Sequence, residues 1–242
     1  MDTTVIKGLR VLEHLSLASE PIMLSHLARD LGLQKSNAHR LLTTLKSEGY
    51  VDQEIDSGRY FATLRTWELG VSRLMSHPLK AQVSASLQEV HRSLGETVNL
   101  AMFLGKQMIY LDKIHAPRPF DFYTHVGSRV STLRTSSGRV VLAFRSDSEA
   151  QLDDILASED PASNDSRADI LRDLADIREK GYATIEGQFV SEIKGIATPI
   201  SDVKGEAIGA LSCSGPILRI RSKEDRIIST LKSVSDKIRI SA

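Results

Sequence analysis

Five polar or basic side chains gather in one short stretch of the sequence and have the chemistry to bind DNA. They are Lys35, Ser36, Asn37, His39 and Arg40. Lysine and arginine bind phosphates, and arginine, asparagine and serine also hydrogen-bond base edges. Such groups form a reading surface only if one element holds them on the same side, so the flanking pattern decides whether they can act together.

The flanking residues predict a helix-turn-helix that would hold these side chains. Apolar residues recur at helical spacing over 24–31, and Gly32 ends that short helix. A second apolar series predicts an amphipathic helix over about 34–48, which Gly49 ends. Residues 35–40 would then lie on its N-terminal, outward side, which is the end that a recognition helix presents to the major groove.

The sequence predicts a β-hairpin over 50–63, directly after this helix. Strand-forming residues flank the turn Asp56-Ser57-Gly58, where glycine can take a positive φ. A hairpin in this place is the wing of a winged helix, and Arg59 beside its tip could reach a phosphate or the minor groove. A surface hairpin with a solvated arginine is the alternative interpretation.

A further helix is predicted over about 64–76, where Trp67, Val71 and Leu74 recur at helical spacing before Pro78. We interpret it as a linker helix, whose apolar stripe packs either within its own domain or on a second copy of the chain. The expected organisation is a DNA-binding domain over 1–66, a linker helix over 67–78 and a second domain over 79–242.

The composition bounds the possible functions. A chain of 242 residues suits one large or two modest domains, and its 31 basic and 31 acidic residues give no net charge, which counts mildly against nucleic-acid binding. The single cysteine, Cys213, excludes an intrachain disulfide and suits a reducing cytosol. The first residues lack a signal-peptide pattern, and no apolar run approaches the ~20 residues of a membrane span. We therefore expect a soluble, cytoplasmic protein without a membrane partner.

After Pro78 the pattern changes to mixed helices and strands. Strands are predicted over 97–104 and 107–114 around a Gly105 turn, over 120–123, and over 182–185, 194–200 and 206–214 near the end of the chain. An apolar helix is predicted to begin at Ser136 or Ser137. Paired strands flanked by helices indicate an α+β domain, with an antiparallel sheet covered by helices.

The chain resembles the IclR-type bacterial transcription regulators over nearly its whole length. The likeness rests on a series of segments in matching order: IKGLRVLEHL, HLARDLGLQKSNAHRLLTTLKSEGYV, SGRYFA, GETVNLAMF, MIYLDKI, VGSRVSTLRTSSGRVVLAF, IREKGYA, GIATPISD and GALSCSGP. The resemblance implies an N-terminal winged helix-turn-helix and a C-terminal effector-binding domain with a GAF-like α/β fold. It also implies binding to double-stranded operator DNA as homodimers or dimers of dimers, with repression or activation modulated by a small metabolite, often an organic acid.

The resemblance also implies where an effector would bind. Ser136, Ser137 and Gly138 match a loop-to-helix junction whose backbone amides hold a carboxylate, an arrangement that a helix N-terminus favours. Ser212 and Ser214, which alternate on one strand, would face the same cavity. Ordinary helix capping and strand chemistry is the alternative for these serines.

Two positions of this expected pocket depart from the pattern of the family. Ile185 stands where many members have an acidic residue, and Gly195 stands where many have cysteine. Both departures remove polar groups, so they disfavour the usual oxo acids and favour a larger or more apolar acid, including an aromatic one.

Other chemistries are less well supported by the sequence. Asp112, His115, Asp121 and His125 form a loose group without compact metal-ligand spacing, so no metal or other cofactor is expected. The GxSxG, HExxH and GxxxxGK motifs are absent from the sequence, and we expect no enzyme activity. The alternative function is a metabolite-binding or catalytic C-terminal domain with a winged helix that contacts proteins. Operator binding without turnover of candidate acids would separate the two.

Overall fold

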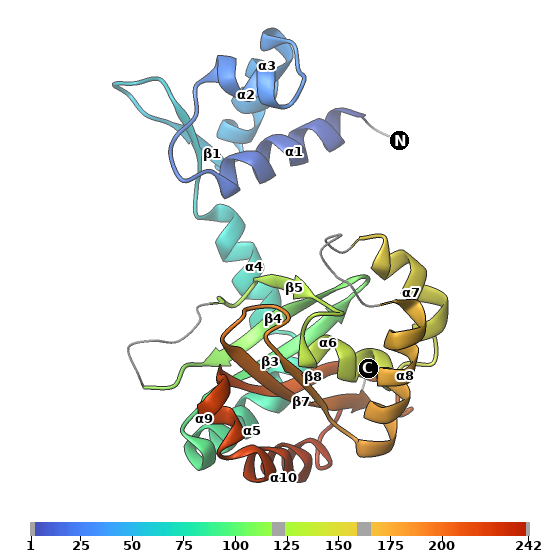
Figure 1. Ribbon diagram of the computed structural model, residues 1–242. Helices are drawn as coiled ribbons and strands as arrows, with labels where there is room; N and C mark the ends of the chain where they lie inside the picture. The colour runs from blue at the N-terminus through green and yellow to red at the C-terminus, as the bar shows by residue number, and fades with distance from the viewer. Residues whose placement is uncertain (1–2, 118–123, 159–165, 241–242) are drawn as a thin grey trace. The chain divides into compact units, whose positions relative to one another are not determined.

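The computed structural model describes residues 3–117, 124–158 and 166–240 (Figure 1). They form two compact units, Met1–Met75 and Ser76–Ala242. A strand expected over 120–123 lies outside the described residues, as does Asp121. No helix in the described ranges is long and apolar enough to cross a membrane.

The first unit is a winged helix-turn-helix, as expected. Its core joins the buried sides of all three N-terminal helices to the hairpin, through residues such as Val11, Leu27, Leu42 and Tyr60. Gly32 has a φ of 63° and lets the chain turn between the second and third helices. The elements are α1 (Thr3–Leu17), α2 (Leu24–Asp30), α3 (Lys35–Ser47), β1 (Val51–Gln53), β2 (Tyr60–Ala62) and α4 (Arg65–Met75).

The second unit is built on one sheet, which confirms the expected α+β class. The strand order is β5-β4-β3-β8-β7-β6, and these neighbours are antiparallel, whereas β9 pairs with β7 in parallel. The strands are β3 (Thr97–Leu104), β4 (Gln107–Ile114), β5 (Arg129–Ser131), β6 (Ala183–Glu186), β7 (Ile193–Asp202), β8 (Ala207–Pro216) and β9 (Arg239–Ile240).

Helices cover both faces of this sheet (Figure 1). On one face α6 packs against β7 and β8, and the alanines Ala101, Ala197 and Ala210 in this core let the helix approach closely. On the other face α5 packs on β3 and β4, and α10 packs on β7. The helices are α5 (Pro78–Leu94), α6 (Ser136–Ala143), α7 (Ser148–Leu156), α8 (Arg167–Lys180), α9 (Ile217–Arg221) and α10 (Glu224–Ser235).

Candidate DNA-binding surface and ligand pocket

The outward side of α3 carries the side chains that the sequence singled out. The helix begins at Lys35, and its buried residues Ala38, Leu41 and Leu42 fix which side faces the core. The opposite side is therefore open to solvent, which leaves it free for a groove of DNA. Four of the five candidates, Lys35, Ser36, His39 and Arg40, are exposed, and Asn37 is half-buried, with its Oδ1 accepting a long bond of 3.4 Å from Arg40.

Arg59 is presented by the hairpin that follows. The amide of Glu54 donates to the carbonyl of Arg59 at 2.8 Å, and Gly58 takes a φ of 67° in the turn between them. The hydroxyl of Ser57 accepts a bond from the Arg59 amide at 3.2 Å. These bonds fix the backbone while the guanidinium stays exposed, as a phosphate contact requires.

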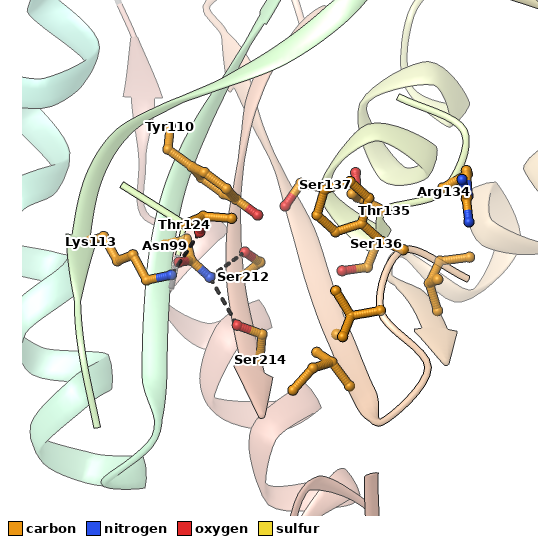
Figure 2. A pocket seen from close by; sticks show the side chains of 15 residues that line it. Asn99, Tyr110, Lys113, Thr124, Arg134, Thr135, Ser136, Ser137, Ser212 and Ser214 are labelled. Atoms are coloured by element: carbon orange, nitrogen blue, oxygen red, sulfur yellow. Dashed lines mark hydrogen bonds between the residues drawn. The ribbon is translucent and has the colours of Figure 1, made fainter. Parts of the chain in front are cut away.

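The second unit contains a cavity where the N-terminus of α6 faces the central strands (Figure 2). Its volume is about 50 Å³. Six of the seven positions expected at an effector pocket line it: Ser136, Ser137, Ile185, Gly195, Ser212 and Ser214. The structure thus brings together residues from a helix and three strands that are far apart in the sequence.

Gly138, the seventh of these positions, is not among the residues that line the cavity. Its amide donates to the capping hydroxyl of Thr135 at 3.2 Å. A Cβ on Gly138 would lie 2.1 Å from the carbonyl oxygen of Thr132, so glycine is needed for the backbones to approach this closely. Ser136 and Ser137, in the first turn of α6, line the cavity, and their amides belong to the turn in which N–H groups lack partners within the helix.

Buried contacts hold this end of α6 in place. Arg139 is 3% exposed, and its Nε donates to the carbonyl of Leu133 at 2.5 Å. Its Nη1 forms an ion pair of 2.8 Å with Asp173 on α8. These contacts therefore hold the first turns of α6 in place beside the cavity.

The opposite wall contains residues that the sequence did not single out. Asn99 on β3 is 1% exposed, and its Nδ2 donates at 3.3 Å to the hydroxyls of both Ser212 and Ser214 (Figure 2). Beside it, Lys113 Nζ donates to the hydroxyl of Thr124 at 2.7 Å. Tyr110 completes this wall, and burial raises the pKa of its hydroxyl to about 12.

A β-bulge brings Tyr110 and Lys113 to the same side. Ala101 pairs with Tyr110 while Leu100 pairs with Asp112, so Leu111 is an extra residue in β4. The bulge shifts the alternation of side chains by one position, and Lys113 then stands directly opposite Asn99. The segment MIYLDKI, which contains both residues, predicts a strand. In a regular strand Tyr110 and Lys113 would lie on opposite faces, because they are three residues apart.

The β6–β7 hairpin closes the cavity on a third side. Ile185 pairs with Gly195 across the two strands, and a Cβ on Gly195 would lie 2.8 Å from the hydroxyl oxygen of Ser136. The glycine therefore leaves room for that serine. The loop between the strands adds apolar side chains, including Phe189, and Arg134 Nε donates to the carbonyl of Gln188 at 2.7 Å.

The loose group of possible metal ligands has other contacts. Asp112 forms an ion pair of 2.8 Å with Lys80 and accepts a bond of 3.0 Å from the hydroxyl of Ser84, which ties β4 to α5. Among the described residues no three histidine, cysteine or acidic side chains lie close enough to hold a metal ion.

Comparison with known proteins gives matches along nearly the whole chain. The family model for the IclR helix-turn-helix domain matches residues 4–54, and the model for the bacterial transcriptional regulator IclR C-terminal matches residues 71–240. The transcriptional regulator XynR of Escherichia coli is 27% identical, covering 91% of this chain and 89% of its own. The repressor IclR of E. coli is 29% identical, covering 93% and 83%.

Solved structures share the same fold. The Thermotoga maritima IclR has a TM-score of 0.73 at 24% identity, covering 97% of this chain and 98% of its own. An IclR homologue from Microbacterium hydrocarbonoxydans, solved with 4-hydroxybenzoate, has a TM-score of 0.79 at 22% identity, covering 97% and 96%.

Proposed function

Because the chain belongs to the IclR family of bacterial transcriptional regulators, we propose that it binds operator DNA through α3 and the wing, under control of a small organic acid. The single observation that carries the DNA-binding part is the outward side of α3, where Lys35, Ser36, His39 and Arg40 are exposed together. These side chains have the donors and acceptors that base edges and phosphates require. As a regulator of operator DNA, the protein would act in the cytoplasm.

We further propose that the protein acts as a homodimer or a dimer of dimers. Two recognition helices must meet major-groove faces about 34 Å apart to read an operator with two half-sites. In α4 every described residue is at least partly exposed, and Trp67 is 63% exposed. Packing of α4 against a second copy of the chain would bury these exposed apolar residues.

The effector is proposed to bind in the cavity beside α6. Its volume of about 50 Å³ is small against the ~300–1,000 Å³ of pockets that bury drug-sized ligands, which supports a short acid over an aromatic one. The Microbacterium protein binds an aromatic acid, but it is only 22% identical to this chain. That likeness shows a shared fold and does not show a shared ligand.

A mobility-shift assay tests the DNA-binding part, with DNA from upstream of the chain's own gene and of its neighbours. We expect binding by the full chain, and the Arg40→Ala variant should lose about 1–3 kcal/mol of binding free energy if Arg40 reads a base. If neither the wild type nor the variant binds any of these fragments, and a candidate acid is turned over, the result would support the alternative of a catalytic C-terminal domain.

The Ser137→Tyr variant tests the effector site. The added ring would fill the cavity, because Ser137 is 2% exposed and faces it directly. We expect calorimetry to show no effector binding to this variant and the mobility shift to show wild-type DNA binding. An effector that binds the variant as tightly as the wild type must bind elsewhere.

A further inference from the structure

We propose that the cavity of the second unit selects a short dicarboxylate, with one carboxylate at the N-terminus of α6 and the other beside Lys113. This inference rests on the proposed function of the cavity as the effector site. It adds a ligand class that neither the sequence nor the relatives assign, and it follows from the charges and hydrogen-bonding groups of the two walls.

The cationic side chains of the cavity lie at opposite ends. Lys113 lies on the wall formed by β3 and β4, whereas Arg134 lies on the far side, next to the first turn of α6 (Figure 2). Among the lining residues that the structure describes, none is aspartate or glutamate. A ligand with one negative group would meet only one of these cations, and a ligand with a negative group at each end would meet both.

The first end combines the helix terminus with Arg134. The amides of Ser136 and Ser137 belong to the first turn of α6, where backbone N–H groups lack partners within the helix and the helix dipole favours an anion. Arg134 uses its Nε for the carbonyl of Gln188, and a guanidinium has four further N–H donors. A carboxylate placed here would receive both backbone and side-chain donors.

The second end is organised by Asn99. Its Nδ2 gives one hydrogen to Ser212 and one to Ser214, so each serine oxygen acts as an acceptor and its own proton is free to point elsewhere. Both serines line the cavity, so these protons can be donated to a ligand. Tyr110 and Lys113 add further donors to the same wall.

Asn99 also lies beside the cationic side chain of this end. Lys113 on β4 is the cross-strand neighbour of Asn99, and both residues line the cavity together with Ser212 and Ser214. Among the described residues the buried amide oxygen of Asn99 has no hydrogen-bond partner. An amide oxygen only accepts hydrogen bonds, so a donor must complete it, such as a hydroxyl group carried by the ligand, and the second carboxylate is held by Lys113 and the serine hydroxyls.

The test compares acids of equal chain length that differ in one carboxylate. The dissociation constants of malonate and propionate, and of succinate and butyrate, are measured by calorimetry on the full chain in a buffer without carboxylates. We expect each dicarboxylate to bind at least about tenfold more tightly than its partner, because hydrogen bonds to charged groups are the strong ones. Lactate and pyruvate serve as further probes with one carboxylate.

Variants then locate the preference. Lys113→Met should bring the two dissociation constants to within about threefold of each other by weakening only the dicarboxylate. Lys106→Met is the matched control, because Lys106 is an exposed lysine at the turn between the same two strands and should leave the preference intact. Ser137→Tyr should abolish binding of both acids.

Equal binding of dicarboxylates and monocarboxylates would overturn the inference, and so would a preference for lactate or pyruvate, or a preference that survives in Lys113→Met. Failure of every acid to bind would overturn it as well. None of these outcomes affects operator binding, so the mobility shift judges the proposed DNA-binding function separately.

Discussion

Replacing Gly138 by alanine should destabilise the second unit, although alanine is the better helix former. The new Cβ would lie 2.1 Å from the carbonyl oxygen of Thr132 and 2.4 Å from its Cα. Both are backbone atoms, which cannot move aside by a change of rotamer. The helix and the segment before it would have to separate by about 0.9 Å before the contact reached 3.0 Å, below which Cβ atoms are not found.

The expected size follows from two opposing effects. Overpacking a tight core costs about 1–3 kcal/mol, and a clash with backbone belongs at the upper end. The gain in helix propensity from glycine to alanine is about 0.8–1.0 kcal/mol. The net loss in the free energy of unfolding is then about 2 kcal/mol, which for a unit of this size lowers the melting temperature by about 4–8 °C.

Differential scanning calorimetry of the full chain measures this shift. Gly8→Ala is the matched control, since Gly8 also lies inside a helix, and there the added Cβ would meet only Leu41 Cδ2, at 4.0 Å. The control should raise the stability of the first unit by about the propensity gain. A melting temperature for Gly138→Ala at or above that of the wild type would refute the reasoning, because it would mean that α6 and Thr132 do not approach this closely.

Two further predictions concern the first unit. Arg59→Ala at the wing should weaken binding about equally for all DNA sequences and reduce the slope of log affinity against log salt by about 1, and an unchanged slope would remove Arg59 from the phosphate contacts. Effector binding should change the fluorescence of Trp67, and Trp67→Ala should uncouple operator release from effector binding. The reason is that a ligand changes operator affinity only by favouring one of two arrangements of the recognition helices. If the fluorescence ignores the effector and the variant loses fold and DNA binding together, Trp67 serves only the packing of its own unit.

The recognition helix was predictable because its signals are local. Buried residues recur along α3 at helical spacing, so a one-dimensional pattern determines which side faces the core and therefore which side faces solvent. The hairpin that forms the wing was predictable from the same kind of signal, a glycine turn between two short strands. The N-terminus of α6 belongs to this class as well, because Thr135 caps the helix three residues before Gly138. Each of these features is specified within about ten residues of chain.

The role of Gly138 was not predictable in this way. Its place in the motif made it a candidate ligand residue, but the close approach of Thr132 depends on how α6 sits in the core. The same holds for Gly195, whose missing side chain leaves room for Ser136 on another element. A glycine in a sequence shows where a side chain is absent, and only the fold shows what occupies the space.

The cavity wall formed by β3 and β4 depends on strand register, which no local pattern specifies. Asn99 reaches Ser212 and Ser214 because β3 pairs with β8, more than a hundred residues later in the chain. Lys113 joins them only because the bulge at Leu111 reverses the alternation that the sequence alone would suggest. A regulator can therefore change its ligand by altering a register or a bulge in this wall while the helix terminus that holds the first carboxylate stays the same.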